Sequence, residues 1–144
     1  PHWDDSARGM LTGLTRSSGL AQAARAVIES IAYQVRDVFD EMQSATGGAL
    51  RVLMADGGVT RNAQLMQFQA DILGVPVQRN DTAELSAMGA AYLAGLATGV
   101  WSSTVDIAAL PRSIKRLEPT MDAAERDRLV AGWQDAVART TLHP

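Results

Sequence analysis

Apolar residues recur at helical spacing over residues 20–42, and the charged residues of this segment lie away from the apolar face. This is the pattern of an amphipathic helix that packs on a core through one side. Ser17 or Ser18 is suited to cap its start, and Gly47 and Gly48 mark its end.

A short, nearly continuous apolar run at residues 50–55 follows, bounded by glycines. Such a run is typical of a strand buried on both faces, as in a parallel sheet. The apolar spacing then predicts a second helix at about residues 62–73, with Gly74 in the place of a C-terminal cap. A second short strand is expected at residues 75–78, where Pro76 favours an edge strand or a strand start.

Three further elements are expected. Asp81 and Glu84 resemble a capping box that opens a third helix, which ends near Thr98. Thr120 is suited to cap a final amphipathic helix, and a short strand is plausible at residues 9–14.

The alternation of helices and strands predicts right-handed crossover units and the α/β class, with helices packed on a small, mainly parallel sheet. A length of 144 residues suits one compact domain. We expect a strand-bearing segment at 1–18, an α/β core at 19–101 and a helical tail at 102–144.

Composition narrows the class of protein. Apolar residues make up 47% of the chain and charged residues 20%, which excludes a disordered tail, a collagen-like fibre and a coiled coil. A net charge of −3 without a block of like charges argues against a nucleic-acid partner. The absence of cysteine excludes a disulfide scaffold, a zinc–cysteine site and thiol catalysis, and it fits a cytoplasmic protein.

Two segments are candidates for a membrane span and a signal peptide. Residues 85–105 hold no charged residue and are long enough to span a membrane, but Ala, Gly, Ser and Thr fill them. We therefore expect a tightly packed soluble helix and no membrane span. The first five residues have neither the basic nor the apolar region of a signal peptide, and they suit a chain cut from something longer or a processed start.

The sharpest candidate site is the strand–turn–helix that contains Asp56, Gly57, Gly58 and Asn62. Ligands of open α/β sheets bind beyond the carboxyl ends of the strands. The two glycines let a phosphate or ribose approach the backbone, and the free amides of the next helix favour an anion. Asn62 adds an amide that both donates and accepts.

A structural alternative stays open, in which the glycines only make a tight turn and Asn62 is an exposed residue at a helix start. The three-glycine dinucleotide fingerprint and the phosphate loop ending in Gly-Lys-Ser/Thr are both missing, which disfavours a dehydrogenase and a loop-type ATPase. No His pair has metal-ligand spacing. Met42, Met54, Met66 and Met88 are expected in the core, and Trp3, Trp101 and Trp133 are expected to be packing anchors.

The chain resembles the FGGY family of carbohydrate kinases along nearly its whole length. The resemblance lies in residues 1–16 (PHWD, ARG, GLTR), 24–38 (ARA, ESIAYQ, RDV), 56–74 (DGG, N, LMQFQADILG), 87–101 (AMGAAYLAGLA, GVW) and 131–133 (AGW). Residues 65–74 are most similar to the branch of the family that phosphorylates glycerol. His2 departs from that branch, which usually has Tyr there.

This resemblance implies an actin-like ATPase fold with two ribonuclease-H-like lobes, of which residues 1–144 are a partial C-terminal nucleotide-binding lobe. Family members transfer the γ-phosphoryl group of ATP to a polyol hydroxyl, with an Asp as base and Mg²⁺ bridging the phosphates. Gly58 and Asn62 match the positions that contact ATP or ADP, and Asp56 and Gly57 form the turn beside them. The catalytic Asp, the metal-holding residues and the glycerol contacts are expected upstream of Pro1, so no catalytic residue or metal ligand is placed on this chain.

Alternatives remain at this point: a sibling kinase acting on xylulose or gluconate, or a non-catalytic interaction module. The strand at residues 50–55 is expected to have a bare apolar edge, because its neighbour in the related fold comes from residues upstream of Pro1. Such an edge is a template for pairing with another chain, so we expect a homo-oligomer, formed by self-association or by swapping an element with a second copy, or else a soft, partly molten domain. The rival expectation is a rigid monomer in which residues 1–18 fold back to cover the edge.

Overall fold

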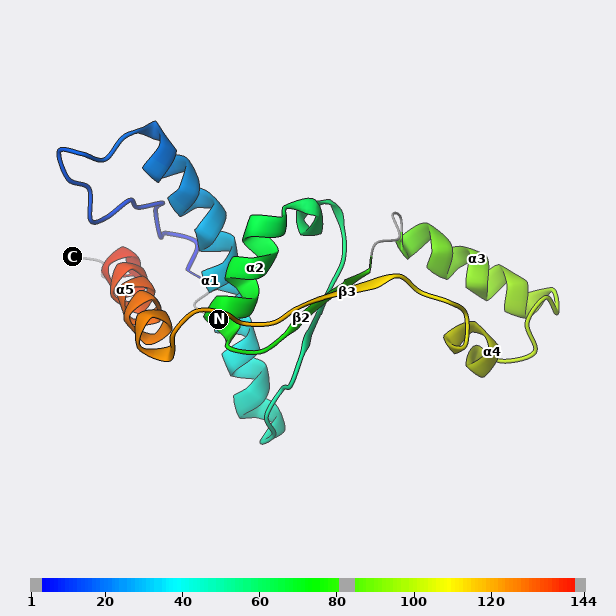
Figure 1. Cartoon of the computed structure of the whole chain (residues 1–144). Helices are drawn as coiled ribbons and strands as arrows, with labels where there is room; N and C mark the ends of the chain where they lie inside the picture. The colour runs from blue at the N-terminus through cyan, green and yellow to red at the C-terminus, as the bar shows by residue number, and fades with distance from the viewer. Residues whose placement is uncertain (1–3, 81–84, 142–144) are drawn as a thin grey trace.

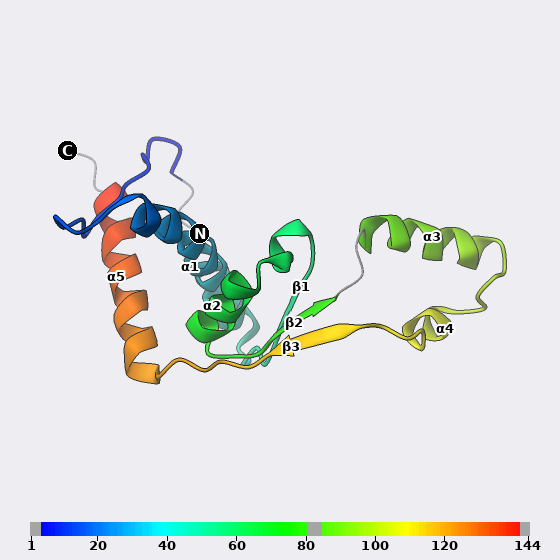
Figure 2. The ribbon, with the colours of Figure 1, turned by 45° about the horizontal axis from the view of Figure 1, so that its top comes forward.

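The computed structural model describes residues 4–80 and 85–141. The elements in chain order are α1 (Leu20–Thr46), β1 (Leu53–Ala55), the 3₁₀ helix η1 (Gly58–Arg61), α2 (Ala63–Leu73), β2 (Val77–Asn80), α3 (Leu85–Ala97), α4 (Thr104–Ala108), β3 (Ile114–Leu117) and α5 (Ala123–Thr141). Figures 1 and 2 show α1, α2 and α5 together at one end of the molecule, and α3 and α4 at the opposite end, with the strands between them.

The sheet has three strands in the order β1-β2-β3. β1 pairs with β2 in parallel, with Leu53 opposite Val77, whereas β2 pairs with β3 antiparallel, with Val77 opposite Leu117. The α/β class and the small sheet with packed helices are therefore confirmed, but the sheet is mixed. Sequence analysis did not predict β3, which lies inside the segment expected to be a helical tail.

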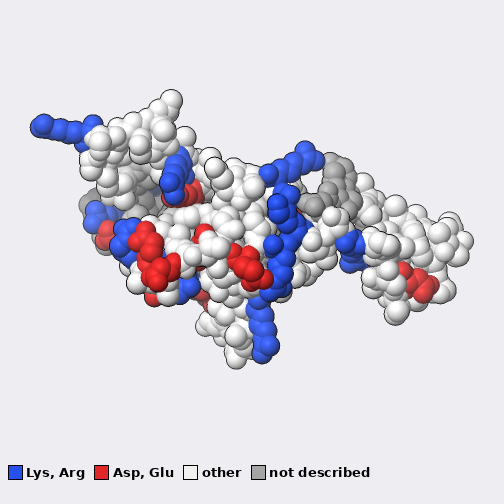
Figure 3. All heavy atoms as spheres, viewed as in Figure 1, with Lys and Arg blue, Asp and Glu red and all other residues white. Residues whose placement is uncertain are grey.

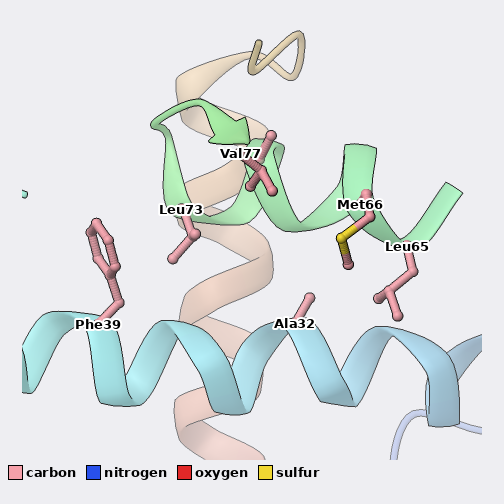
Figure 4. Packing of buried hydrophobic residues seen from close by; sticks show 7 residues of the cluster. Ala32, Phe39, Leu65, Met66, Leu73 and Val77 are labelled. Carbon is pink, nitrogen blue, oxygen red and sulfur yellow. The ribbon is translucent and has the colours of Figure 1, made fainter. Parts of the chain in front are cut away.

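The core is the seam between α1 and α2, closed by β2. Figure 4 shows its buried apolar side chains, which include Ala32 and Phe39 of α1, Leu65, Met66 and Leu73 of α2, and Val77 of β2. Polar groups bridge the same seam: the amide of buried Gln69 donates to the carbonyl of Ala32 at 3.1 Å, and Arg36 donates to the carbonyl of Ile72 at 2.6 Å. These bonds satisfy groups that would be costly to bury unpaired.

The predicted helix ends are largely confirmed. Gly47 and Gly74 end α1 and α2 in the left-handed conformation, at φ 64° and 69°, which glycine adopts at little cost. The predicted cap of α1 is wrong. Gly19 is the N-cap, and its backbone N–H donates to the side-chain Oε1 of Gln22. The Ser18 hydroxyl instead accepts from the backbone N–H of Thr15.

Thr120 is likewise not the cap of the final helix. Asp122 takes that place, because its carboxylate accepts from the backbone N–H of Ala124 at 2.8 Å. The helix predicted to end near Thr98 ends at Ala97. The Asp81–Glu84 capping box lies outside the described residues.

The strand predictions need more correction. Residues 9–14 form neither strand nor helix, and no described strand lies beside them to complete a ladder. β1 is shorter than predicted and is not buried on both faces, since Met54 is 73% exposed. The prediction that Met42 and Met54 lie in the core is therefore wrong, whereas Met66 is buried as predicted. β2 lies two residues later than expected and is central in the sheet, so Pro76 precedes a strand start.

The tight packing predicted for this helix is wrong: α3 carries no charged residue, yet most of it is exposed, and Gly95 is its buried residue. The indole of Trp101 folds back over Gly95, where a Cβ would come within 2.1 Å of the ring. Trp101 also meets Tyr92 edge-on at 5.4 Å, so it is a packing anchor as predicted. No helix in residues 4–80 and 85–141 has the length and apolar content needed to cross a membrane.

An aromatic cluster attaches α5 to α1 and α2. Tyr33 stacks on Trp133 at 5.3 Å and meets Phe68 edge-on at 5.6 Å. The indole N–H of Trp133 donates to the carboxylate of Asp37 at 2.8 Å. Trp133 is thus confirmed as a packing anchor.

The first prediction concerns Tyr33. Burial, followed by the nearby carboxylate of Glu29, raises the pKa of Tyr33 from 10.0 to about 12. The stability associated with its neutral phenol is fully present below pH 10 and is lost as the pH rises towards 12, because the unfolded chain deprotonates first. Urea titrations at pH 8 and pH 11 measure how much the free energy of unfolding falls between these two pH values. This fall should be smaller in Tyr33→Phe than in the unchanged chain. An equal loss in both proteins would contradict this assignment.

The second prediction concerns Asp71, which is 8% exposed. Its Oδ1 accepts from the backbone N–H groups of Thr120 at 2.6 Å and Met121 at 3.1 Å, and from the amide of Gln67 at 3.1 Å. Asp71→Ala should lower the free energy of unfolding by about 1.5–3 kcal/mol, because it removes hydrogen bonds to a charged acceptor. Asp127→Ala, at a largely exposed side chain, is the matched control and should change it by less than about 0.5 kcal/mol.

Candidate functional site

The predicted turn follows β1 directly and is built around two glycines. Gly57 has φ 90° and ψ 174°, a conformation that residues with a side chain rarely adopt, and Gly58 begins η1. A Cβ placed on either glycine would meet no atom within 4 Å. The backbone of the turn therefore borders open space in which a ligand can approach it closely.

The turn is held in shape by Thr60, which is 6% exposed. Its hydroxyl donates to the carbonyl of Gly57 at 2.8 Å, and its backbone N–H donates to the same carbonyl at 3.1 Å. From β2, Nη1 of Arg79 donates to the carbonyl of Thr60 at 2.7 Å. These bonds fix the path of the chain between β1 and α2.

Asn62 is the N-cap of α2. Its Oδ1 accepts from the backbone N–H groups of Gln64 and Leu65, each at 3.1 Å. The cap uses the side-chain oxygen, so the Nδ2 amino group is the part of Asn62 that can donate to a ligand. The structural interpretation of Asn62 as a helix-start residue is thus correct, and it leaves a binding role compatible with the geometry.

Two of the four predicted residues, Asp56 and Asn62, each line a different hollow. Asp56 lines a cavity of about 290 Å³ at the carboxyl ends of β1 and β2, walled on one side by α3. Asn62 lines a larger one of about 610 Å³ between the N-terminal halves of α1 and α2. Along the chain, Gly57 and Gly58 lie between these two lining residues.

Sequence reasoning missed polar residues of both hollows. Arg79, Asn80 and Arg112 line the first, and Arg25 and Glu29 line the second. Arg79 and Asn80 stand at the carboxyl end of β2, so the rule that ligands bind there would have found them had the strand been placed two residues later. No signal in the sequence pointed to Arg112, because its segment was taken as a connection.

Positive charge lies beside the turn. Arg79 of β2 is opposite Lys115 of β3, and Arg61 ends η1. Figure 3 shows Lys and Arg side chains in a band that crosses this face of the molecule over the strands. A basic surface next to exposed backbone amides favours an anionic ligand. Within residues 4–80 and 85–141, no three His, Cys, Asp or Glu side chains are placed to hold a metal ion.

Comparison with known proteins defines the class. The family model described as the FGGY family of carbohydrate kinases, C-terminal domain, matches residues 1–98. This chain belongs to that family.

Its similar relatives are glycerol kinases. The glycerol kinase of Solidesulfovibrio magneticus is 54% identical over 140 residues, which is 97% of this chain and 28% of that protein. The glycerol kinase of Nitratidesulfovibrio vulgaris strain Miyazaki F is 55% identical over 139 residues, which is 96% of this chain and 28% of that protein. The chain thus spans between a quarter and a third of the length of these curated relatives.

Solved structures agree with the family. The glycerol kinase of Plasmodium falciparum with ADP matches with a TM-score of 0.88 and 34% identity, over 100% of this chain and 29% of that one. The xylulose kinase of Rhodospirillum rubrum matches with a TM-score of 0.74 and 31% identity, over 94% of this chain and 28% of that one.

Proposed function

We propose that this chain is the C-terminal part of an ATP-dependent glycerol kinase, which transfers a phosphoryl group from ATP to glycerol to give glycerol 3-phosphate. The observation that carries the proposal is the 54–55% identity to glycerol kinases over almost the entire chain. The higher TM-score against a glycerol kinase than against a xylulose kinase supports the same branch of the family.

Within that enzyme we propose that Asp56, Gly57, Gly58 and Asn62 form one wall of the ATP/ADP site. The glycines present backbone amides to the phosphates or the ribose, Asn62 donates through Nδ2, and the basic band attracts the phosphate charge. Phosphoryl transfer depends mainly on positioning and on stabilising charge, which is the contribution these residues are suited to make. The ADP bound in the similar Plasmodium falciparum enzyme supports a nucleotide as the ligand.

Three finer points belong to this proposal. Mg²⁺ would neutralise phosphate charge during the transfer, and no group of three His, Cys, Asp or Glu side chains among the described residues of this chain is placed to hold it. The reaction would take place in the cytoplasm, in keeping with a cysteine-free chain. For the 144-residue chain by itself we propose a homo-oligomer through the edge of β1, which pairs with β2 on one side and has no other described strand beside it.

The third prediction tests the branch of the family by joining this chain to the upstream portions of two kinases. A hybrid with the upstream portion of the Solidesulfovibrio magneticus glycerol kinase should phosphorylate glycerol with ATP, because closely related partners preserve the packing between the two portions. The matched hybrid with the Rhodospirillum rubrum xylulose kinase should be inactive on xylulose, and the 144-residue chain alone should be inactive on glycerol. Activity of the xylulose hybrid with a folded but inactive glycerol hybrid would overturn the proposal.

The fourth prediction tests the nucleotide site in the glycerol hybrid. Asn62→Ser keeps a good helix cap but removes the Nδ2 donor, so the KM for ATP should rise roughly two- to tenfold while the KM for glycerol changes little. Asn62→Ala should raise the KM for ATP similarly and also lower the free energy of unfolding by about 1 kcal/mol, because the cap is lost. An unchanged KM for ATP in both variants would remove Asn62 from the site.

A further inference from the structure

Arg79 connects the central strand to the glycine turn. It is opposite Ala55, the last residue of β1, and it stands two positions after Val77. Because alternate residues of a strand point to the same face, Arg79 is directed to the face of the sheet on which α2 and η1 lie. Its guanidinium reaches the carbonyl of Thr60 at 2.7 Å from Nη1.

The bond from Arg79 is the first of a short series that ends at the turn. It anchors the carbonyl of Thr60, while the hydroxyl and N–H of Thr60 both donate to the carbonyl of Gly57. Carbonyls of a short 3₁₀ helix have few partners within the helix itself, so a cation from a neighbouring strand is a strong substitute. The conformation of Gly57 is thereby tied to β2, the strand with a neighbour on each side.

We infer that Arg79 is a positioning residue for the nucleotide: by holding η1 against the sheet, it keeps the Gly57–Gly58 amides and Asn62 in the arrangement that binds ATP. This inference rests on the proposed nucleotide site. Arg79 acts through Thr60 and the turn, although its side chain also lines the cavity that Asp56 borders.

The fifth prediction compares Arg79 variants in the glycerol hybrid. Arg79→Gln should raise the KM for ATP roughly tenfold, because a misplaced turn weakens nucleotide binding, while kcat and the KM for glycerol change less than about twofold. Arg79→Lys should recover part of the loss, since an ammonium can still donate to the carbonyl of Thr60. Arg51→Gln, which removes the same charge at an exposed position before β1, is the control and should leave all three constants unchanged.

Amide hydrogen exchange in the 144-residue chain gives a readout that does not depend on activity. Arg79→Gln should accelerate exchange at the N–H of Thr60, whereas exchange at Met66 and Ala70 in the core helix should stay slow. Unchanged exchange at Thr60 would overturn the inference. So would a parallel change in both KM values, kcat and the exchange of core amides, because that result describes a merely structural residue.

Comparison with the Asn62 variants separates the two levels of the proposal. If Asn62→Ser raises the KM for ATP and Arg79→Gln does not, the inference about Arg79 is wrong and the nucleotide site stands. If neither variant affects the KM for ATP, the proposed site itself is wrong, and the positioning role is overturned with it.

Discussion

The parallel packing of α1 against α2 is the constraint on which the rest of the described structure depends. Ala32 is fully buried at this contact, and its carbonyl accepts the amide of buried Gln69. Val77 of β2 packs on the same cluster, with Leu53 of β1 beside it. Because the seam fixes α2 relative to both strands, it also fixes where the turn between β1 and α2 can lie.

Polar side chains then attach the outer segments to this seam. Asp71 binds the segment before α5, Asp37 binds the indole of Trp133 within α5, and Arg79 binds η1. Each bond contributes on the order of 1 kcal/mol net, but each also selects one geometry for a segment that has little apolar burial of its own. Directional bonds therefore place the parts of the fold that the hydrophobic core does not hold.

Among the described residues, two stretches of uncovered apolar surface stand out. One is a groove of about 390 Å³ along α1, lined by residues that include Val35, Val38 and Met42 and reaching Leu53 of β1. The other is α3, where Leu93 is 70% exposed. Continuous apolar surface of this kind marks an interaction site, which agrees with a chain that spans 28% of the length of its glycerol kinase relatives.

The sequence by itself determined the local features: the helical period of α1 and α2, the glycines that end them, and the strand–turn–helix around Gly57. These follow from neighbouring residues, through periodicity and the conformational freedom of glycine. Tertiary structure decided what depends on partners distant in the chain. No strand in the described part of the chain lies beside residues 9–14, β3 pairs with the edge of β2 that β1 leaves open, and Arg79 meets Thr60 because β2 pairs with β1. No pattern within one segment records these contacts, because a strand and a hydrogen-bonded turn each need a partner that folding alone brings near.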